Sequence, residues 1–275
     1  MRAIDAHAHV LDPERFAYVA ETPYRPSAQE IGTPEQYLAV LDAHGISHAL
    51  LVQPTSGYAC DNRCMLDAVA RYAPRLRAIV RIDCGEPRPD VSVLDNPQVV
   101  GLRLDLIGEG DHLMHTPGLP WVLDALRERQ QLLQIQCERD QLAAALPQLL
   151  AAKLTLIVDH CGRPEPAVGV QQPGFQALLE LGREGHYVKL SGAFRFSREP
   201  VSLADTRPFV DALIETFTPM HCVWGSDWPY LRLPTRRDYG PALAMFAEWL
   251  PDARDRERVL CDVPRKLFRF DQAGP

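Results

Sequence analysis

Long apolar runs are missing from this sequence, because none approaches the roughly 18 consecutive residues that a membrane-spanning helix requires. The first residues also lack a basic segment followed by an apolar one, so no secretory signal is visible. The seven cysteines are scattered without the short, regular spacings of a disulfide framework. We therefore expect reduced and mostly buried cysteines, in a cytoplasmic protein without a membrane partner.

An excess of basic residues is also missing, since the formal net charge is -7 at pH 7. Binding to a nucleic-acid backbone needs a basic face, so we expect no nucleic-acid partner. A small anionic substrate is still compatible with this charge, because a local cluster of arginines can lie within an acidic protein. The first apolar run, IDAHAHV over residues 4–10, lacks the G-x-G-x-x-G fingerprint of dinucleotide-binding folds.

Short apolar runs that alternate with amphipathic segments are what the sequence does contain. Such alternation indicates βαβ units and a parallel sheet. About eight units in 275 residues favour a single (β/α)8 TIM barrel domain over residues 1–275, and an open doubly wound sheet is the alternative. The expected strands lie within residues 4–10, 48–54, 76–83, 99–106, 132–137, 154–162, 187–192 and 222–229, and the clearest helical patterns cover residues 34–45, 119–130, 139–152 and 174–185.

Polar residues stand at the ends of these runs, where the active site of a parallel barrel lies. His7 and His9 are two residues apart, so on a strand both side chains share one face. Asp227 lies between Trp224 and Trp228, where an unpaired carboxylate would be costly, and we expect a cationic, metal or catalytic partner for it. The other candidates are Gln53, Thr55, Ser56, Asn62, Arg103, Asp105, Gln136, Asp159, His160, Lys189, Ser191, Arg195 and Ser226.

Three histidines and one aspartate form the strongest pattern among these candidates. A single histidine at a strand end is usually just hydrogen-bonded, so the combination carries the prediction. His7 and His9 on the first strand, His160 after the sixth and Asp227 after the eighth are expected to converge at one barrel mouth.

Several longer stretches carry a resemblance to a known family. They are DAHAHV, LVQPTSGYACDNRCMLDAVA, GLRLDL, IVDHCGRP, VKLSGAFRFS, WGSDWPY and VPRKLFRF. In this combination the sequence resembles the amidohydrolase superfamily. More narrowly, it resembles the branch that contains 2-pyrone-4,6-dicarboxylate lactonase and related sugar and muconate lactonases. The resemblance runs nearly end to end and implies a distorted barrel whose catalytic aspartate, on the last strand, is Asp227.

The resemblance also bears on metal binding. Binuclear members of the superfamily use a lysine on strand four and a histidine on strand five, whereas this sequence has Arg103 and Gln136 in those neighbourhoods. Arginine stays protonated and cannot be a ligand, so we expect no bridged two-metal site. The lactonase branch is known to work without metal, and we expect no required cofactor. The alternative is a single divalent ion such as Zn²⁺, held by the same three histidines and Asp227.

Lactone hydrolysis assigns a role to each of the four residues. We expect Asp227 to be the base that activates water, and His7, His9 and His160 to donate hydrogen bonds to the carbonyl oxygen of the lactone. The expected partner is thus a small-molecule lactone or carboxylate.

The resemblance further implies which residues bind the substrate. Arg103 and Arg195 would hold carboxylates, although Arg198 is close enough to compete with Arg195 for that role. Tyr24 and Thr55 would each supply a hydroxyl, and Gln136 stands where the family has a tyrosine. Glu109 stands where the family has a second arginine, so a monocarboxylate lactone or an uncharged sugar lactone fits as well as the pyrone dicarboxylate.

Two further functions use the same residues. One is a mononuclear, metal-dependent hydrolase or nonoxidative decarboxylase. The other is a non-catalytic carboxylate-binding protein, which is disfavoured because Asp227 and all three histidines are present.

Overall fold

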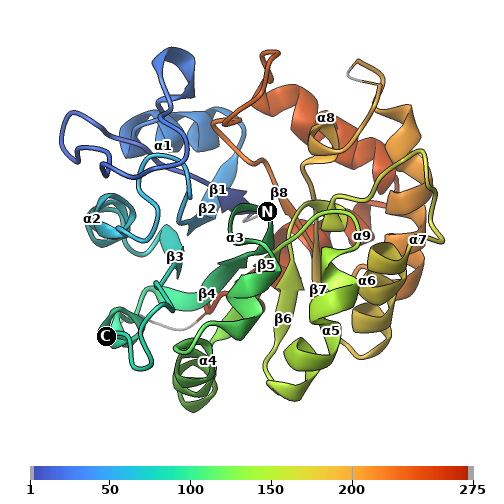
Figure 1. Ribbon diagram of the computed structural model, residues 1–275. Coiled ribbons are helices and arrows are strands. Elements are labelled where there is room, and N and C mark those ends of the chain that lie inside the picture. Colours follow the sequence, from blue (N-terminus) through green and yellow to red (C-terminus); the bar gives the residue numbers. More distant parts are fainter. Residues whose placement is uncertain (1–2, 200, 272–275) are drawn as a thin grey trace. The chain divides into compact units, whose positions relative to one another are not determined.

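The structure is a computed structural model that describes residues 3–199 and 201–271. Its strands form an eight-stranded sheet in which they follow one another in chain order, with helices between them (Figure 1). This order confirms the predicted (β/α)8 fold class, and each of the expected strands is present. The strands are β1 (Ala3–Ala8), β2 (Ile46–Val52), β3 (Leu76–Val80), β4 (Val99–Asp105), β5 (Leu132–Gln136), β6 (Leu156–Val158), β7 (Tyr187–Ser191) and β8 (Cys222–Gly225).

The predicted helices are confirmed as α1, α4, α5 and α6, with ends that differ by a few residues. None of the helices in the described part of the chain combines the length and apolar character needed to cross a membrane. The helices are α1 (Pro34–Ala43), α2 (Arg63–Arg71), α3 (Leu106–Glu109), α4 (Leu119–Glu128), α5 (Gln141–Ala151), α6 (Pro173–Arg183), α7 (Arg207–Phe217), α8 (Tyr239–Trp249), α9 (Ala253–Glu257) and α10 (Val263–Leu267).

By its internal contacts the chain divides into two compact units. The first contains residues 1–81, 95–100 and 224–275, and the second contains residues 82–94 and 101–223. A single domain over residues 1–275 stays a prediction.

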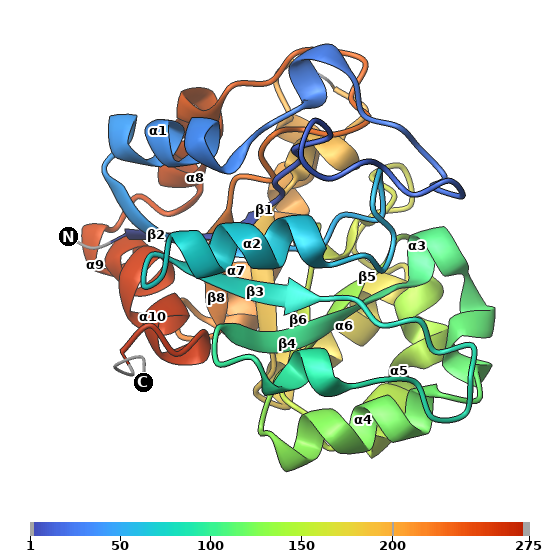
Figure 2. The ribbon, with the colours of Figure 1, turned by 90° about the vertical axis from the view of Figure 1, so that its left-hand side faces the viewer.

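The first unit places β1 and β2 side by side and in parallel, and β2 pairs with β3 in the same way. All six residues of β1 are buried, as expected for a strand covered on both faces. Helix α2 packs on β2 and β3 (Figure 2). Helix α1 begins at a capping box, in which Thr33 and Gln36 each accept a hydrogen bond from the backbone N–H of the other.

The second unit is built from β4 to β7, which pair in parallel and in order. Helix α6 contacts both α5 and α7, and both α6 and α7 pack on β7 (Figure 1). The apolar residues of β5 and β6 are buried, and Leu133, Ile135 and Ile157 have no exposed surface. This burial explains why the strands of this unit appear in the sequence as nearly continuous apolar runs.

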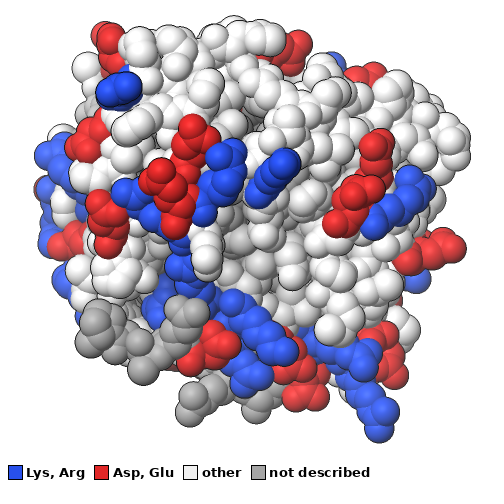
Figure 3. Space-filling model, turned by 90° about the horizontal axis from the view of Figure 1, so that it is seen from below, with Lys and Arg blue, Asp and Glu red and all other residues white. Residues whose placement is uncertain are grey.

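The surface carries mixed charge. On the face shown in Figure 3, basic and acidic side chains lie beside one another. In the last helices of the first unit, for example, Arg258 pairs with Asp255 at 2.7 Å and Arg265 with Asp262 at 3.5 Å. Exposed pairs of this kind contribute at most about 1 kcal/mol each to stability.

Candidate active site

His7, His9 and Asp227 form a buried cluster in the first unit, where β1 and β8 end. The Nε2 atoms of His7 and His9 lie 3.8 and 3.6 Å from Oδ1 of Asp227. The two imidazole rings meet edge to face with their centroids 5.0 Å apart, so both side chains do lie on one side of the strand. The structure therefore brings together three of the residues on which the predicted chemistry depends.

The ring of His9 is oriented by the neighbouring strand. Its Nδ1 lies 2.7 Å from the carbonyl oxygen of Val52, the last residue of β2. A carbonyl oxygen can only accept, so Nδ1 carries a proton. In the neutral ring Nε2 then has no proton, whereas in the imidazolium both nitrogens carry one. Nε2 of His9, which faces Asp227, therefore donates only as part of an imidazolium, whereas in the neutral ring it can accept a hydrogen bond or bind a metal ion.

The backbone at Asp227 is left-handed, with φ of 63°. A residue with a Cβ adopts this conformation at a cost of about 1 kcal/mol or more, and it persists where surrounding contacts enforce it. Here the Asp227 N–H donates to the carbonyl of His7 at 2.8 Å, and the Asp227 carbonyl accepts from the N–H of Tyr230 at 2.9 Å. The His9 N–H donates to the carbonyl of Trp228 at 2.8 Å. These bonds fix the Asp227 carboxylate beside the two histidines.

Gly225, the last residue of β8, permits this close approach of the two strands. A Cβ at this position would lie 2.5 Å from the Cβ of His7, a distance that real side chains do not tolerate. Any larger residue at position 225 would therefore displace His7 from the cluster.

Asp5 is a supporting residue that the sequence analysis missed. Its buried Oδ1 accepts from the backbone N–H groups of His7 at 3.1 Å and Ser226 at 2.9 Å. Its Oδ2 accepts from the hydroxyls of Tyr37 at 2.8 Å and Tyr239 at 3.0 Å. Burial raises the pKa of Asp5 above its ordinary value of 3.8, and the hydrogen bonds oppose part of that rise. The period of two in D-A-H-A-H, which places Asp5 on the face of His7, is the signal that could have found it.

A buried polar cluster in the second unit is formed by side chains from β4, β5 and β7 and by Asp159, which follows β6. Nζ of Lys189, which has no exposed surface, donates to Oε1 of Gln134 at 2.7 Å and lies 3.3 Å from Oδ1 of Asp159. Nη1 of Arg103 lies 3.9 Å from Oδ2 of Asp159. Burial alone would raise the pKa of Asp159, but the positive charges of Lys189, His160 and Arg103 outweigh it and hold this pKa below its ordinary value.

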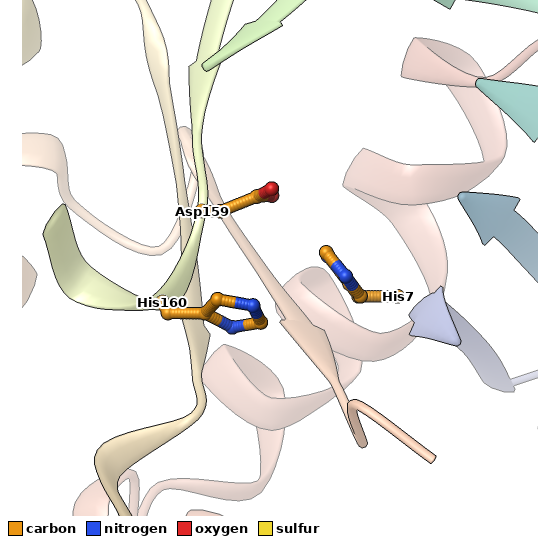
Figure 4. A group of neighbouring side chains, drawn as sticks. All are labelled: His7, Asp159 and His160. Atoms are coloured by element: carbon orange, nitrogen blue, oxygen red, sulfur yellow. The ribbon is translucent and has the colours of Figure 1, made fainter. Parts of the chain in front are cut away.

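His160 follows Asp159 at the end of β6, and both side chains project from this point (Figure 4). Its Nδ1 lies 3.0 Å from the hydroxyl of Ser191 at the end of β7. Gly192 leaves room for the ring, since a Cβ there would lie 2.6 Å from Nδ1 of His160. His160 is thus buried and held in place by the neighbouring strand.

The remaining predicted residues of the second unit differ in their surroundings. The amide oxygen of Gln136 is buried and has no hydrogen-bond partner within residues 3–199 and 201–271. The Arg195 guanidinium lies over the ring of Phe194, 5.5 Å from its centroid. Arg198 is largely exposed and pairs with Glu165 at 2.9 Å. Arg198 therefore has a partner at the surface.

Tyr24 and Thr55 lie in loops of the first unit that follow β1 and β2. The Tyr24 hydroxyl donates to Oε2 of Glu30 at 2.7 Å, which raises the pKa of Tyr24. The Thr55 hydroxyl accepts from Nη1 of Arg81 at 3.3 Å. Both hydroxyls therefore already have hydrogen-bond partners within the protein.

The first unit thus contains His7, His9, Asp227, Tyr24 and Thr55, and it brings the first three into one cluster. The other predicted residues belong to the second unit, and their approach to this cluster stays a prediction. They are His160, Arg103, Gln136 and Arg195.

The cluster of the first unit has the donor set of a divalent-metal site. Its ligand atoms, from His7, His9 and Asp227, all lie within 4.8 Å of one another. Tetrahedral Zn²⁺ with nitrogen and oxygen ligands places them about 3.3 Å apart, close to the histidine–aspartate distances of 3.8 and 3.6 Å observed here. The Nδ1 proton of His9 is donated to a carbonyl oxygen, as is usual for metal-bound histidine. These residues therefore fit a single ion.

Comparisons with known proteins identify relatives over nearly the whole chain. The sequence is 32% identical to a 4-sulfomuconolactone hydrolase from Rhizobium radiobacter, over 97% of this chain and 89% of that protein. It is 26% identical to a 2-pyrone-4,6-dicarboxylate hydrolase from Comamonas testosteroni, over 97% of this chain and 90% of that protein.

A solved structure agrees with these relatives. It is that of a probable 2-pyrone-4,6-dicarboxylic acid hydrolase from Acinetobacter baumannii with citric acid bound, which matches with a TM-score of 0.87 and 27% identity. The match covers 98% of this chain and 100% of that one. The family model described as amidohydrolase matches residues 4–270. The resemblance seen in the sequence is thereby confirmed, and the chain belongs to the amidohydrolase family.

Proposed function

We propose that this protein is a lactonase that hydrolyses a small cyclic ester, with Asp227 as the base. The observation that carries this proposal is the buried carboxylate of Asp227, with the Nε2 atoms of His7 and His9 at 3.8 and 3.6 Å. Ester hydrolysis needs a base for water and donors for the oxyanion, and such a cluster can supply both. Relatives named as hydrolases of 4-sulfomuconolactone and of 2-pyrone-4,6-dicarboxylate support a lactone as the substrate.

The proposed reaction begins when Asp227 takes a proton from water as the water oxygen attacks the lactone carbonyl carbon. The carbonyl oxygen becomes an oxyanion, to which His7 and His9 donate hydrogen bonds, with His160 as the third donor. Removal of one such donor typically costs about 3 to 4 kcal/mol of transition-state stabilisation. The ring C–O bond then breaks, and Asp227 returns its proton to the leaving oxygen. His9 donates to the oxyanion as an imidazolium, because its Nδ1 proton is donated to the carbonyl of Val52.

The proposed substrate carries an anionic group. Two buried cations, Arg103 and Lys189, lie near the carboxylate of Asp159 in the second unit. Arg103 and Arg195 are proposed to hold a carboxylate, because a guanidinium can form two parallel hydrogen bonds with it. The buried amide oxygen of Gln136 would accept from a substrate donor. Tyr24 and Thr55 are proposed to contribute hydroxyls on the loops of the first unit.

We propose that no metal is required. Arg103 and Gln136 occupy the neighbourhoods in which binuclear members have their lysine and histidine ligands, which supports this view. In the alternative, a single divalent ion would be held by His7, His9 and Asp227, with His160 as the further ligand, and its chemistry would be Lewis-acid polarisation of the carbonyl. All seven cysteines lie within the described residues and none forms a disulfide, which supports the proposed cytoplasmic location.

A panel of lactones, assayed by proton release, tests the proposed function. It should contain 4-sulfomuconolactone, 2-pyrone-4,6-dicarboxylate and neutral sugar lactones, each with and without a chelator. We expect hydrolysis of at least one anionic lactone, at a rate that the chelator leaves unchanged. Loss of activity with the chelator would favour a mononuclear metal enzyme. Release of CO2 from aromatic carboxylates, with no lactone hydrolysed, would contradict the proposal and favour a decarboxylase.

A further inference from the structure

Arg232 links three loops of the first unit. Its backbone N–H donates to Oε1 of Glu30 at 2.7 Å, in the loop that follows β1. Its Nε donates to the hydroxyl of Ser56 at 3.2 Å, in the loop that follows β2. Its guanidinium carbon lies 4.9 Å from the centroid of the Tyr24 ring. Arg232 itself belongs to the loop that follows β8, so the loops from three strand ends meet around one guanidinium.

The charged end of Arg232 is still available for a ligand. Glu30 accepts from the backbone N–H of Arg232, and no ion pair joins this guanidinium to a carboxylate among the described residues. Its two terminal nitrogens have no hydrogen-bond partner in that part of the chain, and the side chain is exposed. Arg236, four residues later in the same loop, is different because it pairs with Asp238 at 2.9 Å. A stacked guanidinium with a free fork is suited to a planar anion.

A second guanidinium approaches the same loop. Arg81, which is 4% exposed and follows β3, donates from Nη1 to the hydroxyl of Thr55 at 3.3 Å. Thr55 and Ser56 are consecutive, so two adjacent hydroxyls are each contacted by an arginine. Arg81, which follows β3, contacts Thr55, and Arg232, in the loop after β8, contacts Ser56. This arrangement brings two guanidinium groups to adjacent hydroxyls of the loop that follows β2, where the carboxylate of Glu30 also accepts from Tyr24 and from the backbone of Arg232.

The loop that carries Ser56 is directly connected to the catalytic cluster. It continues β2, whose last residue, Val52, accepts the hydrogen bond that orients His9. Arg232 in turn lies in the segment that begins with Asp227, and that segment is tied to β1 through the hydrogen bond from the His9 N–H to Trp228. The Arg232 loop contacts and the catalytic cluster therefore both lie where β1, β2 and β8 end.

We propose that Arg232, with Ser56 and Tyr24, forms a subsite for an anionic substituent of the substrate, a carboxylate or a sulfonate. This inference rests on the proposed lactonase activity and adds the residue that selects anionic over neutral lactones. It also answers a problem left by the sequence, in which Glu109 stands where the resemblance expects a second substrate-binding arginine. The subsite binds by charge and hydrogen bonds and takes no part in bond making or breaking.

The test compares Arg232→Met with Arg232→Lys, and uses Arg236→Met as the matched control from the same loop. For each variant, kcat and KM are measured with 4-sulfomuconolactone, 2-pyrone-4,6-dicarboxylate and neutral L-fucono-1,5-lactone. Comparison of the sulfonated with the dicarboxylated lactone shows which anion the subsite takes. Calorimetric titration with citrate, a non-reacting tricarboxylate, gives a dissociation constant that is independent of turnover. Melting temperatures show whether each variant keeps its fold.

Loss of the guanidinium should raise KM for the anionic lactones, and Kd for citrate, about tenfold or more. The Arg232→Lys variant should recover part of this loss, and KM for the neutral lactone and kcat should change less than twofold. Arg236→Met should behave as the wild type. An unchanged citrate Kd, or an equal change for neutral and anionic lactones, would overturn the subsite. If the wild type hydrolysed no lactone, the lactonase proposal would fail, whereas the citrate titration would still decide the subsite.

Discussion

Nε2 of His9 lies 3.6 Å from Oδ1 of Asp227, while Nδ1 of the same ring donates to the carbonyl of Val52. The hydrogen bond to Val52 determines whether Nε2 carries a proton, and therefore how it can interact with Asp227. With one proton committed to a carbonyl, the ring has a second proton for substrate only as an imidazolium. An imidazolium beside an aspartate is an ion pair in a buried site, and such a pair is able to polarise a carbonyl and accept a proton from water.

The Asp227→Asn variant should lose turnover and keep substrate binding. Asparagine has nearly the same shape but cannot take a proton from water, and general-base catalysis typically contributes about 10²- to 10⁴-fold. We expect kcat to fall by at least about a hundredfold, while the dissociation constant for citrate changes little. Initial rates on the anionic lactones and calorimetry provide the two measurements. A variant with wild-type kcat would contradict the role of this carboxylate.

The state of His9 separates the metal-free from the metal-bound alternative. In the active, metal-free protein we expect both ring nitrogens of His9 to carry protons, whereas a metal on Nε2 would exclude a proton there. Nitrogen-15 NMR of histidine-labelled protein distinguishes these states, with His9→Gln used to assign the resonance. Metal analysis of protein purified without added metal should give well below one equivalent. Stoichiometric zinc together with an unprotonated Nε2 would establish the mononuclear alternative.

The sequence was most informative where a property is local. Apolar runs predicted each strand, because burial on both faces leaves little freedom in residue type. The spacing of His7 and His9 predicted that they share a face, because the strand repeats every second residue. That prediction succeeded even though the pairing of β1 with β2 is irregular between Asp5 and Ala8, since both rings still meet near Asp227.

The partners of a site residue were harder to predict, because they come from distant parts of the chain. Asp5 accepts hydrogen bonds from the hydroxyls of Tyr37 and Tyr239, which are 32 and 234 residues away in the sequence. No local pattern marks either tyrosine as a partner of a strand residue. The role of Arg232 could not be predicted for the same reason, because its contact with Ser56 spans 176 residues. Such pairings depend on the order of the strands and on the conformations of the loops. A single sequence indicates the order of the strands, but it does not indicate the loop conformations.

Asp5→Asn should change the pH dependence of stability. The pKa of Asp5 is raised by burial, so the folded state holds the proton more tightly than the unfolded chain. The wild type therefore loses stability relative to this variant as the pH rises from about 3.8 through the raised pKa, by about 1.4 kcal/mol for each pH unit between the unfolded-state and folded-state pKa values. Urea titrations of both proteins between pH 4 and pH 8 measure the difference. A constant difference across this range would show that Asp5 has no raised pKa.

Lys189 should be essential for the stability of the second unit. Removing one partner of a buried ion pair leaves the other charge uncompensated, at a cost of about 3 to 5 kcal/mol. Lys189→Met leaves Asp159 near the positive charges of His160 and of Arg103 at 3.9 Å, so we expect destabilisation near the lower end of this range. The double variant Lys189→Met, Asp159→Asn removes both charges and should recover part of the loss. If the double variant were less stable than Lys189→Met alone, the burial of an unpaired carboxylate would not be the cause, and the Lys189–Gln134 hydrogen bond would be the dominant contact.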